Sequence, residues 1–193
     1  GKKEARDLID DCAFFHNVKG LTISVDSSIE GIHIPIGTKI EIQSRRAILR
    51  ALSDLAAFGA KPLCIFLAIN LSKRTSKKQL KKISIGLKMV LEEYNIFLAG
   101  GDISLYDGPI CFSVTAVGEK TKNISGRSGA QAGDLIAVTG TIGDAYVGRM
   151  LIKKKNCKIT KEENIKLIKK FYNPIPRINL GININKFSTS VID

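Results

Sequence analysis

The chain has 193 residues, of which 44% are hydrophobic and 25% charged, a balance that predicts a globular protein with a sizeable core. No apolar run approaches the roughly 20 residues of a membrane-spanning helix, and no apolar region comes after the charged N-terminus, so we expect neither a membrane partner nor a secretory signal. The net charge of +12 could serve a nucleic acid, but the lysines are spread at spacings typical of solvated helix faces, which argues against that partner.

The first part of the chain shows an alternation of strand and helix patterns. Strands are expected over residues 20–26, 63–71, 96–99 and 109–118, and helices over 45–58 and 76–94. Ser44 is a suitable N-cap for the first helix, Gly59 suits its C-terminal cap, and Pro62 prevents the helix from continuing further.

A polar, glycine-rich stretch over residues 119–133 is the expected domain boundary. It divides the chain into an N-terminal domain, 1–120, and the first part of a C-terminal domain, 121–193. In the second part we expect a strand over 134–140, helices over 144–152, 161–171 and 177–187, and a strand beginning at the last residues. The chain is therefore expected to be a fragment of a longer protein. The element order predicts an α+β (mixed α/β) fold.

The cysteines Cys12, Cys64, Cys111 and Cys157 lie far apart and form no Cys-x-x-Cys pair. This spacing argues against a zinc site and against a disulfide framework, so we expect reduced cysteines in a cytoplasmic protein. Because the chain has only two histidines, any metal is expected to bind through oxygen, which indicates magnesium, manganese or calcium.

Acidic residues stand at breaks in the apolar pattern: Asp10 and Asp11 before an apolar run, Asp26 at a strand end, Asp54 in an apolar helix, and Asp102 after two glycines. A buried lone carboxylate is costly, so Asp54 needs a hydrogen-bond donor, a cation or a metal. If these acids converge, divalent cations shared with phosphate oxygens would supply the positive charge. Taken singly, Asp10 and Asp26 are better explained as cap or turn residues.

The chain offers no side-chain nucleophile with a partner base. His16 and His33 are the two histidines, and neither is flanked by a nucleophile motif. From its surroundings in the sequence, His33 is either a substrate contact or an ordinary surface imidazole. The turn from Gly140 to Gly143 could hold an anion, but it matches no established phosphate-binding pattern.

Several short motifs, taken together and in order, resemble those of thiamine-monophosphate kinase. They are Asp10-Asp11-Cys12-Ala13, Ser24-Val25-Asp26 with Glu30-Gly31-Ile32-His33, Ala51-Leu-Ser-Asp54-Leu-Ala-Ala-Phe-Gly-Ala-Lys-Pro62, Ala99-Gly-Gly-Asp102, Arg127-Ser-Gly-Ala130, Gly133-Asp134 and Val138-Thr-Gly-Thr-Ile-Gly-Asp144. Each motif is weak alone, whereas the ordered set covers nearly the whole chain.

The resemblance implies a fold shared with aminoimidazole ribonucleotide synthetase, whose N-terminal α/β domain dimerises by joining sheets. It also implies transfer of the ATP γ-phosphoryl group to thiamine monophosphate, giving thiamine diphosphate, with several magnesium ions. The matching positions imply metal ligands at Asp11, Ser24, Val25 (through its carbonyl), Asp26, Asp54 and Asp102, nucleotide contacts at Gly101, Asp102 and Arg127, and a substrate contact at His33. No nucleophile or base is required, because phosphoryl transfer depends mainly on positioning and charge neutralisation.

The sequence departs from the family pattern at two places. Ile9 stands where the family often has glycine, and the family's later Ser-Asp-Gly segment, expected just past Asp193, is absent. That segment carries further ligands, so we expect this chain by itself to be weakly active or inactive. Three alternatives stay open: another ATP-using synthetase or maturation protein of the same superfamily, a basic nucleic-acid-binding module, and a non-catalytic remnant that only dimerises.

Overall fold

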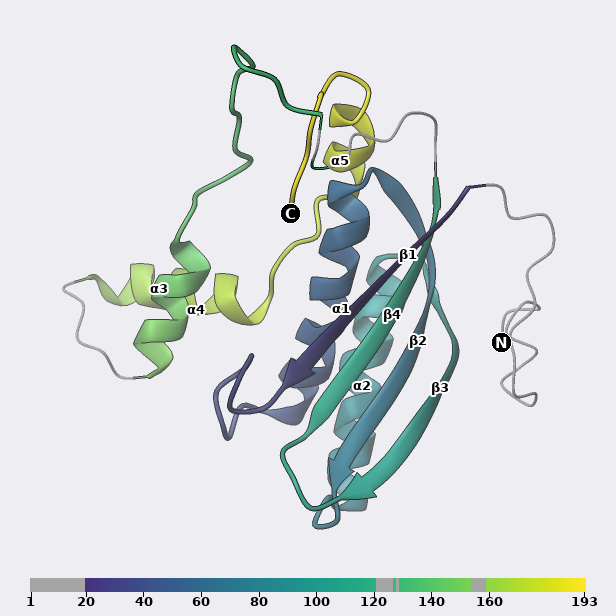
Figure 1. Ribbon diagram of the computed structural model, residues 1–193. Helices are drawn as coiled ribbons and strands as arrows, with labels where there is room; N and C mark the ends of the chain where they lie inside the picture. Colours follow the sequence, from purple (N-terminus) through teal and green to yellow (C-terminus); the bar gives the residue numbers. More distant parts are fainter. Residues whose placement is uncertain (1–19, 121–126, 128, 154–158) are drawn as a thin grey trace.

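The computed structural model describes residues 20–120, 127, 129–153 and 159–193, and its centre is one four-stranded sheet. The sheet comprises β1 (Leu21–Ile29), β2 (Ala60–Ser72), β3 (Phe97–Tyr106) and β4 (Cys111–Lys120). The helices α1 (Ile40–Ala57) and α2 (Lys77–Glu93) lie together against one face of this sheet (Figure 1). The predicted mixed α/β class is confirmed.

The strand order in the sheet is β1-β4-β2-β3. β4 runs antiparallel to both of its neighbours, whereas β2 and β3 are parallel and are joined through α2. A parallel pair needs such a crossover, because its strands point the same way. β1 and β3 are therefore the two edges of the described sheet.

The main hydrophobic core fills the layer between the sheet and the two helices. Fully buried side chains from α1, β2 and β4 include Ile48, Leu52, Leu55, Ile65, Phe112 and Val114. α1 and α2 approach closely at Gly86, where a Cβ atom would collide with the Ser44 hydroxyl and the Glu41 carbonyl. Ser44 Oγ also donates to the carbonyl of Ile83 at 3.3 Å, so this serine links the two helices.

The ends of α1 differ from the prediction. The helix begins at Ile40, after Lys39 as N-cap, and Ser44 lies inside it, because the buried pattern already includes Ile40 and Gln43. At the other end the prediction was right about Gly59, which has a φ of 67° and allows the chain to turn into β2. Pro62 lies inside β2, next to a register shift.

Three strand predictions were wrong. β3 continues through Gly100 and Gly101 to Tyr106, so Asp102 lies within a strand. Residues 134–140 form no strand, and the side chains of Leu135 and Ile136 are 98% and 97% exposed. Residues 188–193 also form no strand. A strand needs a neighbour for its backbone N–H and C=O groups, and these stretches pair with none in the described part of the chain.

The three remaining helices were predicted, and they divide into two groups. α3 (Asp144–Ile152) and α4 (Lys161–Tyr172) pack on each other (Figure 1), and Lys170 of α4 forms an ion pair with Asp144 of α3. α5 (Ile178–Ile184) lies against the C-terminal end of α1 (Figure 1). Asn185 fixes it there, since its Nδ2 donates to the carbonyl of Ala57 at 3.0 Å. None of the described helices is long and apolar enough to cross a membrane.

Candidate functional site

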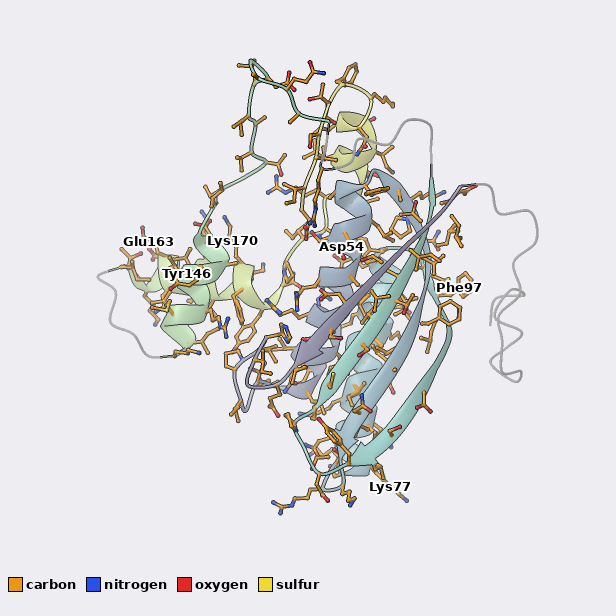
Figure 2. The ribbon with its side chains drawn as sticks, viewed as in Figure 1. Asp54, Lys77, Phe97, Tyr146, Glu163 and Lys170 are labelled. Carbon is orange, nitrogen blue, oxygen red and sulfur yellow. The ribbon has the colours of Figure 1, made fainter. Side chains whose placement is uncertain are left out.

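The candidate site starts from a contact between β1 and α1. Side chains of β1 alternate, so that Ile23 and Val25 are exposed while Ser24 and Asp26 are half-buried towards α1. Ser24 Oγ donates a hydrogen bond to the Asp54 carboxylate, which projects from the last turn of α1 (Figure 2). Asp54 itself is half-buried, not fully buried as its apolar neighbours suggested, because the helix turns this position towards β1 rather than into the core.

A second carboxyl group, that of Asp193, reaches the same place. It shares a hydrogen bond with Asp54, and burial together with the Asp54 charge and this bond raises the pKa of Asp193. The guanidinium of Arg127 lies close enough to act in the opposite direction on that pKa. Asp193 was not among the predicted site residues. The available signal was its position at the end of the short run Ser190-Val-Ile, which resembles the Ser24-Val25 run before Asp26.

Asp26 has a different partner, the guanidinium of Arg50 in α1. The two form an ion pair at 3.1 Å, and Arg50 also donates to the backbone carbonyl of Ser27 at 3.2 Å. Arg50 precedes Asp54 by one helical turn, so α1 presents a cation and an anion side by side to β1. The positive charge that Asp26 requires is thus supplied by the protein itself.

His33 lies in the turn after β1, where Gly31 adopts a φ of 85°. Its Nδ1 accepts a hydrogen bond from the backbone N–H of Ile29 at 3.1 Å, so the neutral ring carries its proton on Nε2. Burial and then the nearby charge of Arg50 lower the pKa of His33, although Asp26 acts in the opposite direction. The imidazole is therefore a neutral donor at neutral pH.

Asp102 lies at the opposite edge of the sheet. Two strands separate β3 from β1, which places the two edges roughly 14 Å apart at the usual strand spacing. The Asp102 side chain is exposed and accepts a hydrogen bond from Ser104 Oγ at 3.2 Å. Packing alone explains the glycine at position 101, because a Cβ there would collide with the carbonyl oxygen of Leu67.

The predicted site residues therefore fall into separate groups. Ser24, Asp54 and Arg127 come together around Asp193, while Asp26 lies beside Arg50. Asp102 and Gly101 lie apart from both groups, and Val25 exposes its side chain on the outer face of β1.

Asp11 and the histidine at position 16 lie outside the described residues. Within the part that is described, no three acidic, histidine or cysteine side chains are grouped as a metal site requires. Convergence of Asp26, Asp54 and Asp102 is not seen among the described residues of one chain, and Asp11 lies outside them.

Comparisons with known proteins relate this arrangement to a group of enzymes. The chain is 36% identical over 195 residues to the thiamine-monophosphate kinase of Buchnera aphidicola subsp. Acyrthosiphon pisum, covering 98% of this chain and 59% of that protein. A structure of AaThiL complexed with AMPPCP and TMP matches with a TM-score of 0.81 and 30% identity, over 94% of this chain and 58% of that one. The chain thus spans about three-fifths of the length of the relatives it matches.

A more distant likeness shows the fold alone. The hydrogenase maturation protein HypE matches with a TM-score of 0.67 at 18% identity, over 86% of this chain and 55% of that one. Residues 9–120 match the family model for AIR synthase related protein, N-terminal domain. The chain therefore belongs to the AIR synthase related family, and this match covers the β1–β4 sheet with α1 and α2.

Proposed function

We propose that the chain carries the site of an ATP-dependent kinase that phosphorylates thiamine monophosphate to thiamine diphosphate. The observation that carries the proposal is the meeting of Ser24, Asp54 and Asp193 between β1, α1 and the last residues of the chain. It is supported by the likeness to the AaThiL complex, which contains an ATP analogue and TMP.

The donors at this place suit magnesium. Two carboxyl groups that share a hydrogen bond repel each other once both are ionised, and a divalent cation between them removes that repulsion. Asp54 and Asp193, with the Ser24 hydroxyl and the Val25 carbonyl, provide hard oxygen ligands, and Asp26 and Asp11 add two more carboxylates. Bound magnesium would neutralise the phosphates of ATP during transfer, while Arg127 supplies a further cation for them.

A homodimer would complete the site. Asp102 lies on one edge of the sheet and Asp26 on the other, so joining β3 of one copy to β1 of a second brings Asp102 towards the acids of its partner. The exposed apolar side chains of the two edge strands support this joining, and they are Leu21, Ile23, Val25, Ile103 and Leu105. In this arrangement Gly101 and Asp102 contact the nucleotide.

The proposal also covers the domain organisation of the chain and its location in the cell. Residues 1–120 form the nucleotide-binding and dimerisation domain, and 121–193 form the first part of a second domain. The family match that ends at residue 120 supports this division. We place the protein in the cytoplasm, where ATP and magnesium are available.

The test is the release of ADP from ATP and magnesium with thiamine monophosphate as the acceptor, with and without the C-terminal part that the relatives have. ADP release that requires this acceptor supports the proposal. Release that requires a different acceptor would instead favour another ATP-using enzyme of the family. An Asp54→Asn variant should lose the activity, whereas Asp107→Asn should keep it, since Asp107 is an exposed acid paired with Lys73.

A further inference from the structure

A cavity of about 430 Å³ lies where α5 meets the start of β2 and the C-terminal end of α2. This volume is typical of sites that hold a small molecule. One wall is formed by Lys61 and Pro62 of β2 with Tyr94 and Asn95 after α2, and the other is formed by residues 176–180. None of the described residues of the candidate site lines the cavity, so it is a separate place on the molecule.

The most buried part of the lining is apolar. Pro62 and Pro176 are both buried, and Ile178 is half-buried, whereas the charged residues of the lining are exposed. Small-molecule sites combine apolar walls with a few polar groups that fix the orientation of the ligand. A ligand that fills this cavity therefore brings an apolar body to the two prolines and a polar end to the mouth.

The charge around the mouth is positive. Lys61 and Arg177 line the cavity, and neither forms an ion pair with another described residue. Glu93 is the acid in the lining, but its carboxylate is already paired with Arg45 at 2.7 Å. The Arg177 guanidinium lies against Gly140, where a Cβ would collide with it, so the glycine leaves the room that this arginine occupies. Two cations without a counter-ion favour an anionic ligand.

Neutral donors complete the lining. The side chains of Tyr94, Asn95 and Asn179 form no hydrogen bond with the residues that the structure describes. Burial, and then the charge of Glu93, raises the pKa of Tyr94, so its hydroxyl keeps its proton at neutral pH. Asn95 adopts a φ of 50°, a conformation that asparagine tolerates better than most residues. A hydroxyl and two amides can donate to the oxygens of a bound anion.

We propose that the cavity binds a small organic anion whose ring carries a phosphate or a carboxylate group. The ring covers Pro62 and Pro176, and the anionic group lies between Lys61 and Arg177, both of which suit its oxygens. A free inorganic anion would leave the proline surfaces exposed to water, and a neutral ring would leave the two cations unpaired. The ligand contacts β2 and α5 together, so binding also strengthens the docking of α5 on α1. The site does not depend on the proposed function.

The test is a titration of the chain with phenyl phosphate and with benzoate, followed through its backbone amide NMR signals. We expect saturable shifts at Asn95 and Asn179 and slower amide hydrogen exchange in α5, because the ligand spans both walls. The probe that binds more tightly identifies phosphate or carboxylate as the anionic group. Inorganic phosphate and benzyl alcohol, which each lack one half of the ligand, should bind at least about tenfold more weakly.

Two variants test the cations. Lys61→Gln and Arg177→Gln should each weaken binding of the tighter probe about tenfold, the usual scale for one charge-assisted contact. Lys78→Gln, at an exposed lysine of α2, is the matched control and should bind like the wild type. Circular dichroism checks that each variant is folded. Because Arg177 also contacts Gly140, Lys61→Gln decides the matter if the Arg177 variant does not fold.

Three results would overturn the site. They are the absence of a saturable shift at Asn95 and Asn179 with either anion, benzyl alcohol that binds as tightly as the anions, and a folded Lys61→Gln variant that binds like the wild type. Inorganic phosphate that binds as tightly as phenyl phosphate would remove the role of the prolines, and with it the organic ligand. Shifts confined to Ser24 and Asp54 would place the probe in the candidate kinase site and would also reject the proposal. Kinase activity enters none of these results.

Discussion

Asp193 shares a hydrogen bond with Asp54, although one residue lies in the irregular end of the chain and the other in the last turn of α1. Contact between two carboxyl groups is favourable only while one of them is protonated. At neutral pH, ionisation of both carboxyl groups would make them repel each other, and the native fold nevertheless keeps them in contact. Such a position is expected where a cation binds.

The Asp54→Asn substitution should separate activity from stability. An amide removes the repulsion with Asp193 and can still accept the hydrogen bond of Ser24, so we expect the free energy of unfolding to stay within about 1 kcal/mol of the wild type. Activity with ATP and thiamine monophosphate should fall about 100-fold or more, through the loss of a ligand for the transition-state charge. Urea unfolding and ADP release measure the two effects. Equal loss of both would show that Asp54 is merely structural.

Magnesium should raise the thermal stability of the wild type. A ligand that binds only the native state stabilises it by about 2.7 kcal/mol at one hundred times its dissociation constant. The melting temperature should therefore increase with magnesium concentration in the wild type and much less in an Asp54→Asn and Asp193→Asn double variant. Potassium chloride at matched ionic strength is the control. A rise that is identical in both proteins would contradict the metal site.

His33 should make stability depend on pH. Because its pKa is lowered in the folded protein, the unfolded chain takes up a proton first as the pH falls below the ordinary histidine value of 6.5. Its contribution is therefore fully present above that value and is lost as the pH falls through the window down to the folded pKa. Urea unfolding of the wild type and His33→Gln at pH 5 and pH 8 should show a smaller pH dependence in the variant. Parallel curves would mean that His33 does not contribute.

The face of the sheet opposite α1 and α2 should mediate self-association. Ile23 is 56% exposed on β1, and replacing it with lysine puts a charge among the apolar side chains of an edge strand. We expect the wild type to sediment as a dimer and Ile23→Lys as a monomer. The matched control is Ile85→Lys, because Ile85 is also 56% exposed but lies on α2, on the other side of the sheet. If both variants sediment alike, the dimer does not use this face.

The close crossing of α1 and α2 should be sensitive to a single methyl group. Gly86→Ala would push a Cβ into the Glu41 carbonyl and the Ser44 hydroxyl, and overpacking of this kind costs about 1–3 kcal/mol. Thermal or urea unfolding measures the loss. Ser84→Ala, at an exposed position of the same helix, should change stability by less than about 0.5 kcal/mol. A neutral Gly86→Ala would mean that the helices can separate at this point without cost.

Local patterns predicted most of the fold correctly. The capping box of Ser76 and Gln79 and the amphipathic stripe after it specify α2 without any tertiary contact. The same applies to α4, whose N-cap Thr160 forms a capping box with Glu163. Residues 134–140 show the limit, because their apolar pattern is that of a strand but no partner lies beside them in the described structure.

The candidate site was less accessible to sequence reasoning. Asp54 stands out in the sequence because it interrupts an apolar pattern, whereas Ser24 is identified only through the family resemblance. Their contact, and the approach of Asp193, depend on how β1 and the end of the chain lie on α1. The strand order places Asp102 on the edge of the sheet opposite β1. That order depends on tertiary contacts and cannot be read from a local sequence pattern.

The docking of α5 on α1 has a consequence for the time at which the site forms during synthesis. Gly181 passes directly over the carbonyl of Ala56, and Asn185 bonds to Ala57, so the end of the chain is guided along α1 towards Asp54. A nascent chain can complete the sheet with its two helices once β4 has left the ribosome. The acid pair must wait for residue 193. The contact between Asp54 and Asp193 therefore forms after the sheet and its two helices are able to fold.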